Sequence, residues 1–275
     1  MKNSSFIILI LSGFLFGSCQ KVIDVKLAAE PPRLVVDAAL IWVKGTNGKT
    51  QSITLSTTSG YFSSEIPKVS GATVFVNNSA NTKFDFIEES TQKGKYTCKS
   101  FSPVIGETYT LTVITNGETY KGNEKLIAST TIESVEQRND LGINSDEYGI
   151  KTNFQDSGAQ TNFYLLSYTS PVSPFPYLEV IDDIFFQGNK AFGLFGNDKL
   201  KKGDEIQIKF REVSERYFNY MKLLTGTAAG GGGGPFQPSP ASTIKGNMVN
   251  QTNARNFCLG YFSVNEVDSL LYTIK

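Results

Sequence analysis

The chain has 275 residues, 40% of them hydrophobic, with 26 basic and 26 acidic side chains and no histidine. Its zero formal net charge argues against nucleic acid as a partner, because phosphate binding requires a basic surface. The lack of histidine excludes Ser-His-Asp and Cys-His catalysis and removes the commonest metal ligand.

The N-terminus has the pattern of a bacterial lipoprotein signal. The apolar run 6–16 is shorter than the roughly 20 residues that a transmembrane helix needs. It ends at Gly17-Ser18-Cys19, which resembles a lipobox, whose cysteine thiol takes a diacylglyceryl group. Two or more acyl chains hold a protein stably on a membrane, whereas one does not. We therefore expect a signal peptide over 1–18, lipidation at Cys19 and a lipidated tether over 19–32. The alternative is a plain secretory signal with an incidental cysteine.

Residues 33–126 have the alternation of an antiparallel sandwich. Pro31-Pro32 end the tether, since proline cannot join a central ladder. Asn116-Gly117 is the strongest hairpin signal of the chain. About seven short strands in such a length are typical of an immunoglobulin-like sandwich. We expect these strands at 33–43, 51–56, 71–76, 83–88, 94–98, 108–114 and 118–122.

Residues 127–275 predict a second antiparallel β domain carrying one helix, so the fold class is all-β. Residues 183–186 and 191–195 are expected to pair across Gly188-Asn189. Two closing strands are expected near 246–249 and 257–264.

A helix is predicted near 213–225. Ser214 is a good N-cap, and an apolar stripe follows it at helical spacing. Five consecutive glycines at 230–234 and a proline-rich stretch then predict a flexible loop over 226–243. A phosphate-binding loop would need a Lys-Ser/Thr pair that opens a helix, and this pair is missing here.

The acidic residues predict no catalytic or metal site. Asp182-Asp183, with Asp198 and Asp204, offer oxygen ligands for calcium, but without the dense spacing of a calcium loop they indicate solvated turn acids. Glu88-Glu89 are adjacent on a predicted strand, so they point to opposite faces and do not form a glycosidase pair. We expect no cofactor, no metal and no catalytic residue.

The cysteines and the loop aromatics leave alternatives open. Cys98 and Cys258 either form a disulfide or serve as small core residues, and their wide separation favours the second. Phe175, Tyr177 and Phe236 are flanked by prolines and are expected in loops. Loop aromatics are candidates for a contact surface, although most aromatic residues of this region are expected in the core.

Several stretches, taken in order and spacing, resemble the DUF4249 lipoproteins of Bacteroidetes over nearly the whole mature chain. They are PPRLVVDAAL, TLSTTSGYF, VSGATVFV, GKYTCKSFSPVIGETYTLTV, NFQDSGAQTNFYLLSY, LKKGDEIQIKFREVSERYFNYMKLL, PFQPSPASTIKGNM and LGYFSV. The resemblance implies a cell-envelope lipoprotein of two β domains, whose relatives are commonly encoded near TonB-dependent outer-membrane receptors. It supplies no catalytic residues.

The function expected on this basis is a non-enzymatic binding accessory to a TonB-dependent outer-membrane transporter. Its anchor would be the lipid at Cys19, on either the periplasmic or the outer face of the outer membrane. A carboxylate-dependent hydrolase and a structural or adhesive surface module are the alternatives.

Overall fold

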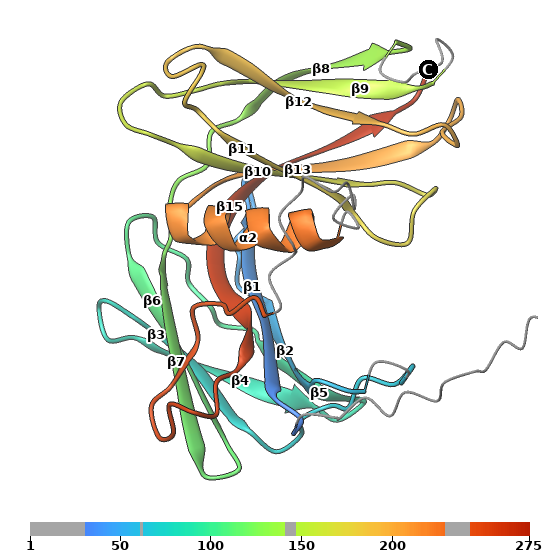
Figure 1. Ribbon diagram of the computed structural model, residues 1–275. Coiled ribbons are helices and arrows are strands. Elements are labelled where there is room, and N and C mark those ends of the chain that lie inside the picture. Colours follow the sequence, from blue (N-terminus) through green and yellow to red (C-terminus); the bar gives the residue numbers. More distant parts are fainter. Residues whose placement is uncertain (1–30, 61–62, 141–146, 229–242) are drawn as a thin grey trace, which may run out of the picture. The chain divides into compact units, whose positions relative to one another are not determined.

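The structure, a computed structural model, describes residues 31–60, 63–140, 147–228 and 243–275. The described part is mostly β with one helix, and from Pro32 to Lys275 it forms one compact unit. The elements are β1 (Leu34–Val43), β2 (Gln51–Thr57), β3 (Thr73–Asn78), β4 (Lys83–Glu89), β5 (Gln92–Cys98), β6 (Thr108–Thr115), β7 (Glu118–Lys125), β8 (Ile132–Arg138), β9 (Gly149–Gln155), β10 (Phe163–Thr169), β11 (Tyr177–Asp182), β12 (Lys190–Gly196), β13 (Glu205–Val213), α2 (Glu215–Ala228), β14 (Val249–Asn250) and β15 (Leu259–Thr273) (Figure 1).

The N-terminal strands form a sandwich from a single folded sheet. The large sheet has the order β11-β10-β13-β15-β1-β2-β5-β4-β3-β6-β7-β14. Strand β4 pairs with β3 around Phe84 and Phe86, and with β5 from Ile87 onward. Inward residues of β1 and β2, such as Val36, share one buried cluster with those of β3 and β6, such as Leu111. The sheet therefore turns back on itself at β4 and closes a core, as the sequence predicts for this region.

The C-terminal strands form a second layered core. A separate three-stranded sheet, β12-β9-β8, packs against the β10 and β13 part of the large sheet. Alternation along β10 divides its side chains between two clusters: Tyr164 and Tyr168 join the core between the sheets, and Leu165 joins the cluster under the helix. The part of the large sheet that contains β10 and β13 thus has the three-stranded sheet on one face and α2 on the other.

The helix forms close to where the sequence predicts it, but it continues to Ala228, so residues 226–228 are helical and not part of the predicted loop 226–243. Residues 229–242 of that loop lie outside the described residues. The cap of the helix is Ser214, whose hydroxyl oxygen accepts a hydrogen bond of 3.2 Å from the Tyr217 amide. Tyr217 and Met221, one turn apart, are both buried against the sheet. Among the described residues, no helix is long and apolar enough to cross a membrane.

One predicted strand pair is wrong. Residues 183–189 form turns, held by hydrogen bonds from the Phe186 amide to the Asp183 carbonyl (2.9 Å) and from the Asn189 amide to the Phe186 carbonyl (2.7 Å). Because this segment satisfies its backbone groups locally, β12 pairs with β9 instead.

The last strand changes partners along its length. Residues 259–267 of β15 pair in parallel with 35–43 of β1, and 268–273 then pair antiparallel with β13. The large sheet is therefore mixed, which corrects the purely antiparallel expectation for the C-terminal region. The close approach of β15 to β1 needs glycine at position 260. Gly260 has φ +86°, and a Cβ there would lie 2.0 Å from the Val36 carbonyl oxygen. The predicted boundaries of the signal peptide (1–18), the tether (19–32) and the two β domains (33–126 and 127–275) stay predictions.

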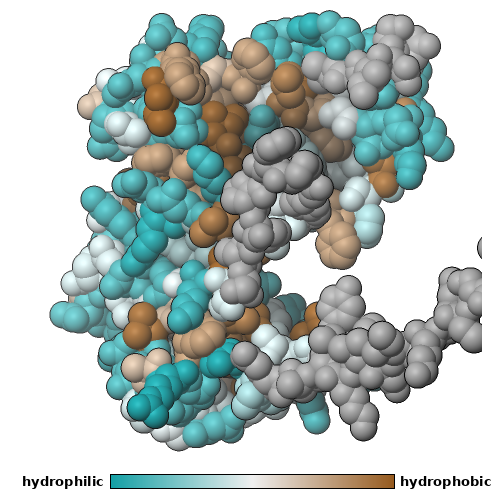
Figure 2. All heavy atoms as spheres, in the orientation of Figure 1, coloured by the Kyte–Doolittle hydropathy of each residue, from teal (hydrophilic) through white to brown (hydrophobic). Residues whose placement is uncertain are grey.

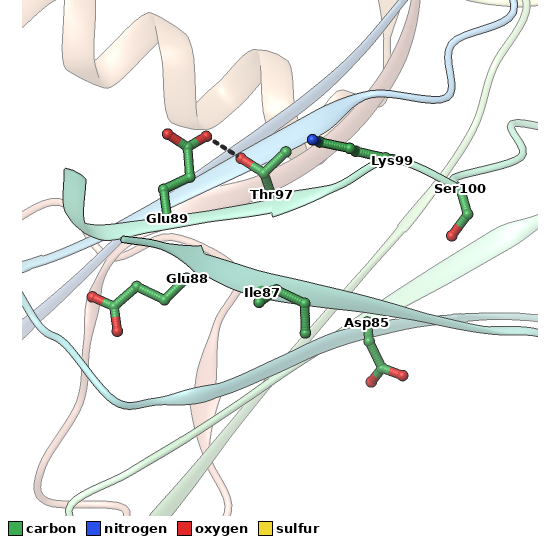
Figure 3. Close-up of a pocket in the computed structure, with 7 residues that line it drawn as sticks. All are labelled: Asp85, Ile87, Glu88, Glu89, Thr97, Lys99 and Ser100. Carbon is green, nitrogen blue, oxygen red and sulfur yellow. Dashed lines mark hydrogen bonds between the residues drawn. The ribbon is translucent and has the colours of Figure 1, made fainter. Parts of the chain in front are cut away.

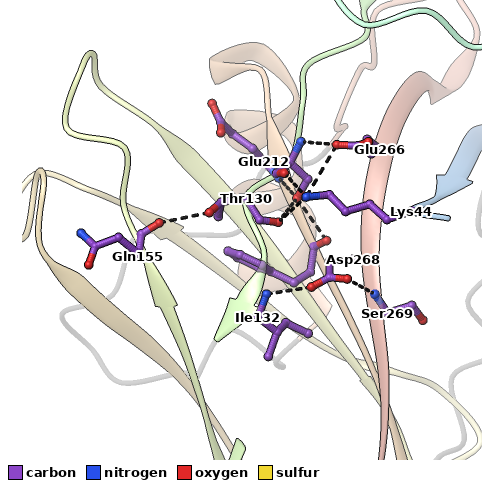
Figure 4. Close-up of polar contacts among 10 residues, drawn as sticks. Lys44, Thr130, Ile132, Gln155, Glu212, Glu266, Asp268 and Ser269 are labelled. Carbon is purple, nitrogen blue, oxygen red and sulfur yellow. Dashed lines mark hydrogen bonds and ion pairs between the residues drawn. The ribbon is translucent and has the colours of Figure 1, made fainter. Parts of the chain in front are cut away.

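Strand β15 also holds the segment that leads from β7 into β8 (Figure 4). The Ser129 amide donates to the Glu266 carboxylate (2.9 Å), and the Ile132 amide donates to the Asp268 carboxylate (2.7 Å). Lys44, which directly follows β1, donates to the carbonyl oxygens of Ser129 and Thr130, and lies 3.9 Å from Glu266. The path of the chain between the two cores is thus tied to β1 and β15.

Candidate functional site

Two of the three aromatic residues predicted as a contact surface are exposed. Phe175 is 76% exposed in the turn before β11, and Tyr177 is 51% exposed. Tyr177 is the first residue of β11 and pairs with Tyr168 of β10, so it lies in a strand and not in the loop that its prolines suggested. Phe236 lies outside the described residues. On the face seen in Figure 2, hydrophobic residues are visible among hydrophilic ones in the part that contains β8–β13.

Strand β11 is an edge of the large sheet, with one side facing the second core. Tyr177 and Glu179 share that side, because alternate residues of a strand point the same way. The rings of Tyr177 and Phe195 are 5.8 Å apart, and Phe195 stacks on Tyr168 at 5.2 Å. The rings of Tyr177 and Phe195 therefore lie together between β11 and β12, on the side of β11 that also carries Glu179.

Gly193 of β12 has no side chain, which lets the Glu179 carboxylate and the Tyr168 hydroxyl approach each other. A Cβ there would lie 2.6 Å from Glu179 Oε2 and 2.7 Å from the Tyr168 hydroxyl oxygen. Thr152 of β9 is its direct cross-strand partner and is fully buried. The neighbouring Leu194 amide donates to Glu179 Oε2 at 3.1 Å. We call the group Thr152, Tyr168, Tyr177, Glu179, Gly193 and Phe195 the β11–β12 edge site.

The polar groups of this site are incompletely satisfied. Burial raises the pKa of Glu179 from its ordinary 4.5 to about 7, and the Leu194 amide opposes that shift. Burial also raises the pKa of Tyr168. In the described part of the chain, neither the Tyr168 hydroxyl nor that of Thr152 has a hydrogen-bond partner of good geometry. Buried polar groups that lack good partners and carboxyls with a raised pKa are concentrated at functional sites more often than in ordinary cores.

Sequence reasoning missed Glu179, although the signal is present. In the run Tyr177-Leu178-Glu179-Val180-Ile181, the glutamate occupies the side of the strand that also carries Tyr177 and Ile181. A charged residue on an otherwise apolar strand face is unusual. Its neighbours Thr152 and Gly193 belong to strands whose partners the sequence does not reveal.

A hollow of about 530 Å³ lies on the N-terminal sandwich and is lined by Asp85, Ile87, Glu88, Glu89, Thr97, Lys99 and Ser100 (Figure 3). Glu88 and Glu89 point to opposite sides there, as predicted. Glu88 accepts hydrogen bonds from the amides of Gly94 and Gly71, both at 2.8 Å, which lower its pKa. The Thr97 hydroxyl, at 2.6 Å, lowers the pKa of Glu89. Both carboxylates stay ionised at neutral pH, so neither is suited to donate a proton.

Asp183 differs from the prediction of a solvated turn acid. It is only 1% exposed, because its carboxylate accepts a 2.8 Å hydrogen bond from the Asn162 amide inside the fold. The Asn162 side chain donates to Glu212 (2.5 Å), whose pKa is raised mainly by burial and also by Asp156 and Asp183. Across the described ranges, no group of three or more His, Cys, Asp or Glu side chains is arranged to hold a metal ion.

The two described cysteines are free and buried in the core of the N-terminal sandwich. The Cys258 thiol donates to the Met248 carbonyl oxygen at 3.4 Å, and burial raises its pKa to about 11. Both therefore serve as small core residues, the alternative that their spacing favoured. Cys19 lies outside the described residues.

Comparison with known proteins identifies a family but no activity. No curated protein matches the chain. Among solved structures, a two fibronectin type-III domain segment from chicken tenascin is 11% identical, covers 67% of this chain and 92% of its own, and has a TM-score of 0.22. A cytokine receptor complex is 6% identical, with coverages of 67% and 86% and a TM-score of 0.26. A DUF4785 family protein from Legionella pneumophila is 9% identical, with coverages of 65% and 52% and a TM-score of 0.26. Residues 20–270 match the family described as "Domain of unknown function (DUF4249)", and the chain belongs to that family.

Proposed function

We propose that the protein is a lipid-anchored cell-envelope protein that binds a partner and catalyses no reaction. The exposure of Phe175 (76%) and Tyr177 (51%) beside the half-buried Glu179 carries the proposal. Large aromatic side chains are expensive to leave in water and dominate binding energy when a partner covers them. Proline residues at 174 and 176 limit the freedom of this segment, which lowers the entropy lost on binding.

The anchor is supported by Gly17-Ser18-Cys19 at the end of the apolar N-terminal run. The substitution Cys19→Ser removes the thiol that would form the thioether to lipid, so the variant should move from the membrane fraction to the soluble fraction. Cys98→Ser, at a buried cysteine, is the matched control and should fractionate as wild type does. A Cys19→Ser protein that stays with the membrane would contradict the anchor.

The proposed partner is a TonB-dependent outer-membrane transporter, which is supported by the resemblance to Bacteroidetes lipoproteins. Full-length lipidated protein, used as bait in detergent-solubilised outer membranes, should retain such a receptor in stoichiometric amount. The double variant Phe175→Ser/Tyr177→Ser should lose it. Ile87→Ser, at an apolar residue of the N-terminal sandwich that is 70% exposed, should still retain the receptor.

If wild type does not retain the receptor, the proposed transport role is wrong. If the double variant retains the receptor as well as wild type does, the proposed contact surface is wrong. Protease treatment of intact cells separately shows whether the protein lies on the periplasmic or the outer face of the outer membrane.

The hydrolase and the adhesive module stay as alternative functions, and no specific contact in the described residues favours either. The hydrolase needs a proton-donating carboxyl together with a second acid. Glu179 has the raised pKa of a proton donor, whereas Glu88 and Glu89 both have a lowered pKa.

A further inference from the structure

We infer that the β11–β12 edge site binds a cationic group, the primary ammonium or guanidinium of a ligand, with Glu179 as its counter-charge. This inference deepens the proposed function and rests on it, because it names the chemistry that the proposed binding edge recognises. Three independent features of the site lead to this class of ligand: an unpaired acid, unsatisfied hydroxyl groups and exposed aromatic surface.

The acid is the first feature. Glu179 is held by one backbone hydrogen bond, from the Leu194 amide at 3.1 Å to Oε2. None of the ion pairs formed within the described residues includes Glu179. A carboxylate that is withdrawn from water without an opposite charge is destabilised, and a bound cation relieves that penalty. An anionic ligand would increase it.

The hydroxyl groups are the second feature. The Tyr168 side chain is 1% exposed and that of Thr152 is 0% exposed, and neither hydroxyl has a hydrogen-bond partner of good geometry in the described structure. The two hydroxyls lie near each other, since Thr152 opposes the rise that burial causes in the pKa of Tyr168. A Cβ added to Gly193 would lie 2.6 Å from Glu179 Oε2 and 2.7 Å from the Tyr168 hydroxyl oxygen, so both oxygens lie close to the same point beside Gly193. Hydroxyl and carboxylate oxygens are the acceptors that the N–H groups of an ammonium or guanidinium require.

Aromatic surface is the third feature. Tyr177 stands two residues before Glu179 on the same strand face, and half of its side chain is exposed. Its ring lies 5.8 Å from that of Phe195. The face of an aromatic ring attracts cations, and its apolar surface packs on the methylene groups of a lysine or arginine side chain. An acid beside aromatic faces therefore favours a cation over a purely apolar ligand.

The experiment uses the full chain in a nonionic detergent at pH 8, where Glu179 is ionised. Saturation-transfer NMR titrations compare N-acetyl-lysine methylamide and N-acetyl-arginine methylamide with the neutral N-acetyl-norleucine methylamide. At least one cationic probe should bind, at least about tenfold more tightly than the neutral probe. Glu179→Gln should weaken that binding by about tenfold or more. Glu205→Gln, at an exposed acid of β13, should leave it unchanged.

Three results would overturn the inference: no binding of either cationic probe to wild type, equal binding of the neutral probe, or unchanged binding to Glu179→Gln. Thermal unfolding shows whether the glutamine variant is folded. If it is not, Glu179→Asp replaces it, which keeps the charge but retracts it by one methylene group and should weaken binding several-fold. The probes need no transporter, so a negative titration refutes the cation site alone, and a negative receptor pull-down refutes the transport role alone.

Discussion

The backbone amide of Ser129 donates a hydrogen bond of 2.9 Å to the carboxylate of Glu266, which lies 137 residues further along the chain (Figure 4). The same carboxylate is 3.9 Å from Lys44 and is only 13% exposed. One acid of β15 therefore satisfies a backbone donor of the connecting segment and also lies beside Lys44, the residue that directly follows β1. This arrangement indicates that β15 stabilises the connection between the two cores as well as completing the sheets.

Replacement of Glu266 by alanine should reduce the free energy of unfolding by about 1–3 kcal/mol, because it leaves the Ser129 amide without its partner. Urea denaturation followed by circular dichroism measures this change. The control is Glu133→Ala, which breaks the exposed pair with Lys190 and should change stability by less than about 1 kcal/mol. Equal effects of the two substitutions would show that the Ser129 contact contributes little.

Substitution of Gly193 by alanine should disrupt the β11–β12 edge site. The new methyl group would lie 2.6 Å from Glu179 Oε2, 2.7 Å from the Tyr168 hydroxyl oxygen and 2.9 Å from Leu166 Cδ2, so these side-chain ends must shift to make room for it. We expect a loss of about 1–3 kcal/mol in the free energy of unfolding. Gly226→Ala in α2, where a methyl group meets nothing within 4 Å, is the control and should not destabilise the protein. A Gly193→Ala protein as stable as wild type would contradict the described packing.

The raised pKa of Glu179 predicts a pH dependence of stability. The folded state keeps the proton up to a pKa of about 7, whereas the unfolded chain releases it near 4.5, so wild type loses stability as pH rises through this window. Glu179→Gln cannot lose a proton. Relative to wild type, it should gain about 1–2 kcal/mol between pH 5 and pH 8, discounted for the partial exposure of the carboxyl.

Urea unfolding of both proteins at pH 5, 6, 7 and 8 measures the difference. For Glu205→Gln, the difference from wild type should stay constant over the same range. A stability difference for Glu179→Gln that does not change with pH, or that changes in the opposite direction, would refute the raised pKa.

The buried thiols predict that reduction has no effect on stability. Cys98 and Cys258 are free, so dithiothreitol should not shift the urea midpoint. Because burial raises the pKa of Cys258 to about 11, little thiolate forms at pH 8, and iodoacetamide should label this residue only after denaturation. Mass spectrometry of the labelled peptides provides the readout. Rapid labelling of Cys258 in the native protein would show that it is accessible, contrary to the structure.

The local elements of this protein are largely predictable from its sequence. Alternation at 51–56 and 108–114 predicts strands that the structure places at Gln51–Thr57 and Thr108–Thr115. The helix predicted near 213–225 runs from Glu215 to Ala228 behind its Ser214 cap. Such patterns are informative because the spacing of apolar residues reports which side of an element is buried. They misled at 183–186, where apolar residues occupy a turn.

The sequence by itself therefore determined the β-rich class, most strand positions and the helix, because each depends on neighbouring residues. Only the tertiary structure decided that β15 pairs in parallel with β1 and then antiparallel with β13. It also decided that Glu179, Tyr168 and Thr152 meet around Gly193. The physical reason is that strand pairing is non-local: the same alternating pattern fits many partners, and the packing of the whole chain selects among them.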